Sequence, residues 1–250
     1  MRRFACLLLA CWVVAASAAP LKLVGEPYPP YLVESKAGLG GPFAEAITSL
    51  LKAEGIEVQF QALPFRRLLL EVGKQENSCA LAVYFSPSDA ETLNYVARLA
   101  PLTLAVYARA GEVGRLSNLE NLRKYSVGAI DIAEVRDLLG ASAIPYAPIA
   151  FANTGPAMLK ARRFDLLISD ASQQMIKQAG VPIDRVFTLA RVERWLACNP
   201  ALPPKTVAAL RRVLREGVLA ESVRPIWRRH GLEDYFDQSR RAWEDSAGKR

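Results

Sequence analysis

The stretch EVQFQALPFRRLLLEVGKQENSCALAVY, residues 57–84, decides the fold class of this chain. It begins with alternating polar and apolar residues over 57–61, a pattern that predicts a strand. Pro64 then opens a helical segment that ends near Gly73. The apolar run 80–84 predicts a second strand after that helix. Strand, helix and strand in this order indicate an α/β fold with a mostly parallel sheet.

The same alternation of strands and helices continues on both sides of this stretch. A helix that starts at Pro42 and stops at Gly55 lies between it and the first strand. We predict further strands over 21–24, 102–107, 125–129, 164–169, 186–189 and 195–197, and further helices over 132–139, 154–163 and 171–179. Two successive α/β units predict two lobes. Ligands of open α/β sheets bind outside the carboxyl ends of the strands, so we expect a cleft between the lobes.

The first residues have the pattern of a processing signal. Two arginines precede an uncharged apolar run over 4–16, and the tripeptide at 16–18 has small residues at its first and third positions. The pattern predicts a signal peptide over 1–18 and a periplasmic mature protein. The run is shorter than the roughly 20 residues that a membrane-spanning helix needs. The segment 8–11 leaves open a lipoprotein signal with a modified Cys11.

Charge and cysteine content narrow the choice of partners. The 250-residue chain carries a formal +7, and loss of the leader with its two arginines would leave +5. The basic residues are scattered, so we expect no nucleic-acid partner.

Of the four cysteines, Cys79 and Cys198 would remain after processing. In an oxidising compartment they suggest one disulfide, the alternative being two separate buried thiols.

Six short motifs follow one another along the mature chain. They are EPYPPY at 26–31, GPF at 41–43, PFR at 64–66, RFDLLISD at 163–170, LREG at 214–217 and IWRRHG at 226–231. In this order and spacing they resemble the type II periplasmic solute-binding proteins, specifically the family that holds the amino-acid receptors of ABC importers. The resemblance covers nearly all of the mature chain.

The resemblance implies a discontinuous first lobe. Two crossing strands, near 102–107 and 187–195, would form the hinge between the lobes. The implied division is 19–104 plus 192–235 for the first lobe, 105–191 for the second lobe and 236–250 for a C-terminal tail. The implied function is the capture of a small polar ligand by hinge closure and its delivery to an ABC permease, by a monomer without cofactor or metal.

The chain departs from the family at two places. The family's amino-acid receptors place a carboxylate-binding arginine after the third strand, where residues 86–91 of this chain contain none. They place a Gly-Thr or Gly-Ser pair where this chain has Asp131 and Ile132. The aspartate that meets the ligand ammonium is matched by Asp170. An ordinary α-amino acid is therefore doubtful, and an amino-acid-like molecule, an amine or an organic anion stays open.

Nine residues are candidates for ligand binding because they follow strands or open helices at the predicted cleft. They are Glu26, Tyr28, Tyr31, Phe65, Arg66, Tyr84, Ser86, Asp131 and Asp170. Several have a structural alternative. Tyr28 and Tyr31 could pack their loop down, and Tyr84 could lie in the core. Arg66 could form an ion pair with Glu71 or Glu26, and the two aspartates could cap helices.

Two other functions remain as alternatives. One is an enzyme of the dehydratase or lyase type, with Glu26 as general acid. The chain has one histidine, His230, which we expect at a helix C-terminus, and it lacks a serine elbow, metal-ligand spacing and a phosphate loop. We therefore expect a protein that is not an enzyme. The second alternative is a receptor that senses its ligand instead of serving an importer.

The family fold also implies which residues the disulfide joins. Cys79 opens the strand that runs toward the cleft, and Cys198 closes the strand that returns from the hinge. If these strands are neighbours, as in the family, their ends meet at the far edge of the sheet. The resemblance thus predicts a disulfide within the first lobe.

Overall fold

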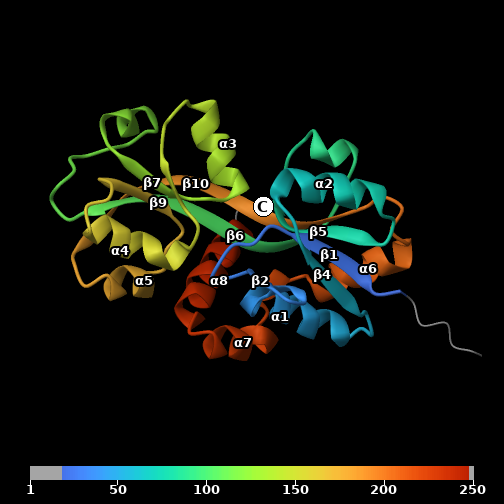
Figure 1. Cartoon of the computed structure of the whole chain (residues 1–250). Coiled ribbons are helices and arrows are strands. Elements are labelled where there is room, and N and C mark those ends of the chain that lie inside the picture. The colour runs from blue at the N-terminus through green and yellow to red at the C-terminus, as the bar shows by residue number, and fades with distance from the viewer. Residues whose placement is uncertain (1–18, 248–250) are drawn as a thin grey trace, which may run out of the picture.

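The computed structural model describes residues 19–247, and the predicted leader with its Cys11 alternative lies outside them. One eight-stranded sheet runs through both halves of the molecule in the order β4-β1-β5-β10-β6-β9-β7-β8 (Figure 1). Its strands are β1 Leu21–Gly25, β4 Val58–Ala62, β5 Ser78–Tyr84, β6 Asn94–Arg109, β7 Val127–Ile130, β8 Ala147–Ile149, β9 Leu166–Ser169 and β10 Ile183–Cys198. A separate hairpin consists of β2 Val33–Ser35 and β3 Gly38–Gly40.

Helices cover both faces of this sheet. Figure 1 shows α2 and α3 above the strands and α1, α7 and α8 below them. The first lobe contains the parallel strands β4, β1 and β5, and the second lobe contains the parallel strands β9, β7 and β8. The helices are α1 Gly41–Lys52, α2 Phe65–Lys74, α3 Ala133–Ala141, α4 Gly155–Lys160, α5 Gln173–Gln178, α6 Pro204–Val213, α7 Arg224–Arg229 and α8 Glu233–Ala247.

The core of the first lobe follows from the alternation of side chains along β1. Leu23 belongs to the apolar cluster that includes Ile47 of α1, whereas the next residue, Val24, belongs to the cluster that includes Leu68 of α2. All four side chains are fully buried. Because successive residues of a strand face opposite sides, a strand apolar at both positions must be covered on both faces. The helix on each side of β1 supplies that cover.

The strands β6 and β10 connect the two lobes. Each has 16 residues, and they pair antiparallel from Arg109 and Ile183 at one end to Asn94 and Cys198 at the other. The sequence predicted only shorter strands within them, because β10 changes register at four places along this pairing. Each such irregularity breaks the period-two pattern that identifies a strand. The lobe boundaries predicted at 104 and 192 fall inside these strands.

The C-terminal segment packs against the first lobe. The helix α8 continues to Ala247, so residues 236–247 are helical where the sequence suggested a tail. Phe236 is fully buried, its ring centroid 6.2 Å from that of Trp227. The Arg224 guanidinium lies 4.5 Å from the centre of the Phe236 ring. The single histidine follows α7 directly, at its C-terminal cap.

A glycine in one of the sequence motifs is explained by a close approach of two backbones. Gly217 has a φ of +60°, and a Cβ at this position would lie 2.0 Å from the carbonyl oxygen of Leu99 in β6. A larger residue would push this turn away from the hinge strand. The motif therefore fixes how the C-terminal helices sit on β6.

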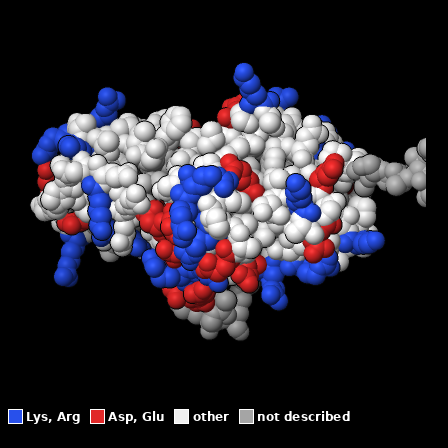
Figure 2. Space-filling view, turned by 90° about the horizontal axis from the view of Figure 1, so that it is seen from below, with Lys and Arg blue, Asp and Glu red and all other residues white. Residues whose placement is uncertain are grey.

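The surface that carries α7 and α8 has charges of both signs. Figure 2 shows lysine and arginine side chains intermingled with aspartate and glutamate over the middle of this face. Many of them are paired: Arg224 contacts Glu221 at 2.7 Å and Asp237 at 2.6 Å, and Arg228 contacts Glu233 at 2.6 Å. Within residues 19–247, no helix is both long and apolar enough to cross a membrane.

The predicted disulfide between Cys79 and Cys198 is confirmed. Cys198 pairs directly with Cys79 in the antiparallel register of β10 and β5, and the two sulfur atoms are bonded. The bridge lies in the first lobe, away from the carboxyl end of β5. It ties the last residue of β10 to the N-terminal part of this lobe across 119 residues of sequence.

We expect reduction of this disulfide to destabilise the protein by about 3–5 kcal/mol, because the open chain gains conformational entropy when it unfolds. Urea denaturation with and without reductant measures the change. The matched control is the double variant Cys79→Ala, Cys198→Ala, whose stability should not respond to reductant. Titration of two free thiols in unfolded, unreduced protein would contradict the bridge.

Candidate functional site

The two lobes meet at a buried contact between Tyr28 and Asp170. Tyr28 lies three residues after β1, and Asp170 is the first residue after β9. The Tyr28 hydroxyl donates a hydrogen bond to the Asp170 carboxylate. The two residues are only 5% and 3% exposed. The ends of strands from two lobes are thus brought together, as the sequence predicted for the cleft.

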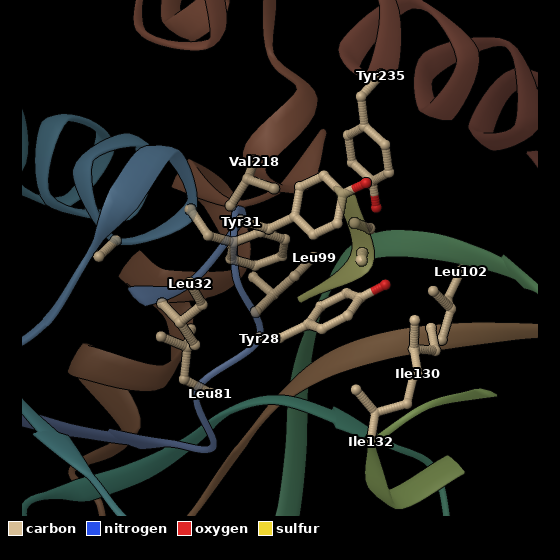
Figure 3. Packing of buried hydrophobic residues seen from close by; sticks show 14 of the residues in the cluster. Tyr28, Tyr31, Leu32, Leu81, Leu99, Leu102, Ile130, Ile132, Val218 and Tyr235 are labelled. Atoms are coloured by element: carbon tan, nitrogen blue, oxygen red, sulfur yellow. The ribbon is translucent and has the colours of Figure 1, made fainter. Parts of the chain in front are cut away.

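Three tyrosine rings pack against one another beside this contact, each tilted relative to the next. Tyr31 lies between Tyr28 and Tyr235 of α8, with ring centroids 5.0 Å and 4.1 Å away. Figure 3 shows the three rings together, with the hydroxyl group of Tyr235 directed toward those of Tyr28 and Tyr31. The Tyr31 hydroxyl contacts the sulfur of Met175 in the second lobe at 3.9 Å. Tyr31 is 1% exposed and packs against Tyr28 and Tyr235, so its structural alternative, packing of its loop, holds in this closed arrangement.

Asp170 has unusual electrostatics for a carboxylate. Burial raises its pKa to about 6, although the Tyr28 hydrogen bond and the nearby charge of Arg194 both act to lower it. Burial also raises the pKa of the tyrosines beside it. The capping alternative for Asp170 is wrong, because Ser172 caps α5 by accepting a hydrogen bond from the Met175 N–H.

A second set of contacts joins the N-terminal ends of α2 and α3. The Glu26 carboxylate accepts a hydrogen bond from the backbone N–H of Phe65 at 3.2 Å. The same oxygen accepts one from the Arg136 guanidinium of the second lobe at 2.6 Å. The other branch of that guanidinium donates to Asp131 at 2.9 Å. Arg136 is thus held between one carboxylate from each lobe.

The neighbours of Arg136 on α3 also reach the first lobe. Glu134 accepts a hydrogen bond at 3.2 Å from Arg194 of β10, and both side chains are only 7% exposed. Asp137 accepts one from the Tyr84 hydroxyl, and it lies 3.4 Å from the Arg66 guanidinium. Three charged residues of the first two turns of α3 therefore contact the opposite lobe.

The two arginines of the buried contacts keep their charge. Burial acts to lower the pKa of Arg194, but Glu134, Tyr28, Tyr235 and Asp170 together outweigh it and hold that pKa above its usual value. Burial likewise acts to lower the pKa of Arg136, and its hydrogen bonds and charge interactions with Asp131 and Glu26 raise it overall. Each lobe thus presents fixed positive and negative charges to the other.

Of the remaining predicted residues, Phe65 and Tyr84 lie beside the contact between the lobes and Ser86 does not. The Phe65 and Tyr84 rings are stacked, with 5.2 Å between centroids and 5° between planes, and they line one side of the contact. Ser86 is not brought to the interlobe contacts. Its N–H donates to Tyr95 of the same lobe, and its hydroxyl contacts Ser88 in its own loop.

The structure changes two of the structural alternatives that the sequence suggested, the ion pair of Arg66 and the helix cap at Asp131. The Arg66 ion pair is made with Asp137 across the cleft, where the sequence suggested Glu71 or Glu26. Asp131 does not cap α3, since its carboxylate pairs with Arg136 and Ile132 holds the cap position without a side-chain hydrogen bond. Arg66 therefore belongs to the interlobe contacts, and Asp131 holds Arg136 from within the second lobe.

The space left at these contacts is small. A cavity of about 20 Å³ is lined by residues that include Glu26, Tyr28, Phe65, Glu134 and Arg194. This is room for about one water molecule. A ligand of ordinary size can therefore reach these residues only when the lobes move apart. Within residues 19–247, no three metal-ligating side chains converge on one point.

Sequence reasoning missed five residues of these contacts: Glu134, Arg136, Asp137, Arg194 and Tyr235. One signal was available for Arg194, because a charged residue directly before the apolar run 195–197 needs a partner if the strand is buried. The charges of α3 gave no such signal. Acidic and basic residues near the start of a helix are equally typical of a solvated face.

Comparisons with solved structures agree with this arrangement. The sensor domain of a histidine kinase with similarity to periplasmic binding proteins has a TM-score of 0.64 at 16% identity, over 84% of this chain and 96% of that one. An ancestral arginine-binding protein bound to arginine has a TM-score of 0.61 at 15% identity, over 85% and 98%. The chain has the two-lobed fold of the periplasmic solute-binding proteins.

A third solved structure is similar over about the same share of this chain. A periplasmic binding protein of the third arginine transport system from Legionella pneumophila has a TM-score of 0.57 at 11% identity, over 85% of this chain and 100% of that one. Neither a protein-family profile nor a curated protein sequence matches the chain.

The predicted α/β, two-lobed fold with two hinge strands is confirmed.

The raised pKa of Asp170 predicts a pH-dependent loss of stability. Its carboxyl binds a proton more tightly in the folded protein, so the free energy of unfolding should fall as the pH rises from about 4 to about 6. A shift of this size corresponds to about 3 kcal/mol. We expect the variant Asp170→Asn to lack this fall, measured by urea denaturation at a series of pH values. The exposed control Asp184→Asn should keep it, and an unchanged pH profile in Asp170→Asn would contradict the assignment.

Proposed function

We propose that this protein is an extracytoplasmic solute-binding protein. It captures a small polar ligand between its lobes by hinge closure and delivers it to an ABC importer in the periplasm. The observation that carries this proposal is the set of polar contacts at the carboxyl ends of β1 and β9, where Tyr28 meets Asp170 across the cleft. Ligands of α/β sheets bind at such strand ends.

The hinge supports closure as the binding motion. Two antiparallel strands connect the lobes, so a rotation about them separates the lobes while the lobes' own sheets and cores stay intact. The cavity beside Glu26 and Tyr28 is too small for a ligand in the present arrangement. The protein therefore has to open, bind and close again, in the manner of a clamp.

A sensing role is the second candidate. The observation that favours it is the likeness to the histidine kinase sensor domain, which has the highest TM-score of the structures named above. Both roles use the same ligand-binding motion, and they differ in the protein that receives the closed form. The genes beside this one discriminate them: permease genes support the importer role, and sensor-kinase genes support the sensing role.

Enzymatic use of Glu26 is disfavoured by its contacts. A general acid must carry a proton, whereas Glu26 accepts hydrogen bonds from the Arg136 guanidinium and from the Phe65 N–H, which are contacts of an ionised carboxylate. We therefore propose binding without turnover. Conversion of a ligand into product during a prolonged incubation would support the enzyme instead.

We expect a thermal-shift screen over amino acids, polyamines, organic acids and oligopeptides to find a stabilising ligand. At a hundredfold excess over the dissociation constant, one ligand adds about 2.7 kcal/mol to the stability. Small-angle scattering of open and closed forms then tests the clamp. A stabilising ligand that leaves the scattering profile unchanged would contradict closure.

An ordinary α-amino acid should bind weakly. Residues 86–91 contain no arginine for its carboxylate, and Arg66, Arg136 and Arg194 each contact a carboxylate of the protein itself. Calorimetry with the common amino acids is the measurement, and submicromolar binding of any of them would overturn the expectation.

A further inference from the structure

The contact between Arg136 and Glu26 places a cation of the protein in its own ligand cleft. The Arg136 guanidinium reaches from α3 of the second lobe to a carboxylate of the first lobe at 2.6 Å. Glu26 also lines the cavity between the lobes. Its side chain is 20% exposed, so the bond is screened from bulk solvent but is not sealed inside the core.

The charge balance of the cleft favours a positive ligand. Five carboxylates lie in or directly beside the interlobe contacts, and three guanidinium groups face them. The carboxylates belong to Glu26, Asp131, Glu134, Asp137 and Asp170, and the guanidinium groups to Arg66, Arg136 and Arg194. The cleft thus has a formal charge of −2 when all of these groups are ionised, and a cation entering it is attracted.

The three arginines are not equivalent. Arg194 belongs to β10, and its pair with Glu134 is almost fully buried, so its guanidinium is shielded from solvent and from a ligand in the closed form. The Arg66 side chain is 80% exposed, and such a pair contributes little. Arg136 alone among the three bridges two carboxylates from different lobes, at hydrogen-bonding distance to both. Its guanidinium has the partners that a cationic ligand would seek.

We propose that Arg136 acts as a tethered competitor, which occupies on Glu26 the subsite of a small cationic ligand carrying a guanidinium or ammonium group. This rests on the proposed function and specifies its ligand class. Opening of the lobes separates Arg136 from Glu26, since the two residues belong to different lobes. An incoming cation then takes the Glu26 carboxylate, while Arg136 keeps its second partner, Asp131, within its own lobe. Arg136 thereby sets the affinity.

The variant Arg136→Ala tests this exchange through the sign of its effect. A competitor lowers the apparent affinity by the fraction of protein that it occupies, so its removal should tighten binding of agmatine or putrescine by about tenfold or more. The matched control is Arg66→Ala, which removes the same charge and another interlobe ion pair but leaves Glu26 occupied. Its affinity should change far less. Calorimetry measures all three proteins.

Two further measurements distinguish a competitor on Glu26 from a purely structural role of Arg136. Glu26→Gln in the Arg136→Ala background should lose the gained affinity, because the cation has no carboxylate to bind. Small-angle scattering without ligand should show Arg136→Ala more open than the parent chain and than Arg66→Ala. If Arg136→Ala unfolds, Arg136→Gln keeps most of the side-chain volume and serves in its place.

Weaker or unchanged binding in Arg136→Ala would overturn the proposal and leave Arg136 a structural latch. Failure of agmatine and putrescine to bind any of these proteins at millimolar concentration would overturn it too. Neither result removes the proposed function, because a neutral or anionic ligand found in the thermal-shift screen would still support the clamp. Absence of any ligand in that screen would instead count against the proposed function.

Discussion

The antiparallel pairing of β6 and β10 is the constraint on which the rest of the structure depends. These strands cross between the lobes and stay paired from one lobe to the other. The lobes can therefore rotate about them but cannot separate. The disulfide at the end of β10 fixes one side of this connection to β5, and Gly217 lets the C-terminal segment lie directly against β6. The position of every cleft residue follows from the rotation about this pair of strands.

Closure brings charges together that differ in their degree of burial. The pair of Arg194 and Glu134 is nearly excluded from solvent, so its Coulomb attraction must offset a large loss of hydration. The exposed pair of Arg66 and Asp137 loses little hydration and gains little. Such ion pairs determine the orientation in which the lobes meet. Their contribution to the stability of the closed form is smaller. A closed state held mainly by matched charges can reopen, as a clamp must.

The sequence predicts this fold well where the signal is local. The strand, helix and strand of residues 57–84 and the pairing of Cys79 with Cys198 required only the order of elements and a family resemblance. Tyr28 and Asp170 were expected at strand ends, but their contact joins residues 142 positions apart and depends on how the lobes rotate. The charges of α3 could not be assigned to the cleft, because the direction in which they point depends on the packing of that helix. Ser86 follows its strand as predicted, yet its contacts stay within its own lobe.

Recognition in such a cleft is an exchange of partners. On the proposed exchange, a cationic ligand replaces one guanidinium on Glu26, so the number of ion pairs on that carboxylate does not change. A ligand shifts the equilibrium between open and closed forms only by its differential affinity for them. The Coulomb attraction that any cation has for Glu26 therefore largely cancels against the bond lost by Arg136. What distinguishes one ligand from another is then its fit to the remaining walls, including the Phe65 and Tyr28 rings that line the cavity. An internal competitor lowers the affinity of every cation by the same factor, so only a cation that also fits the remaining walls binds tightly.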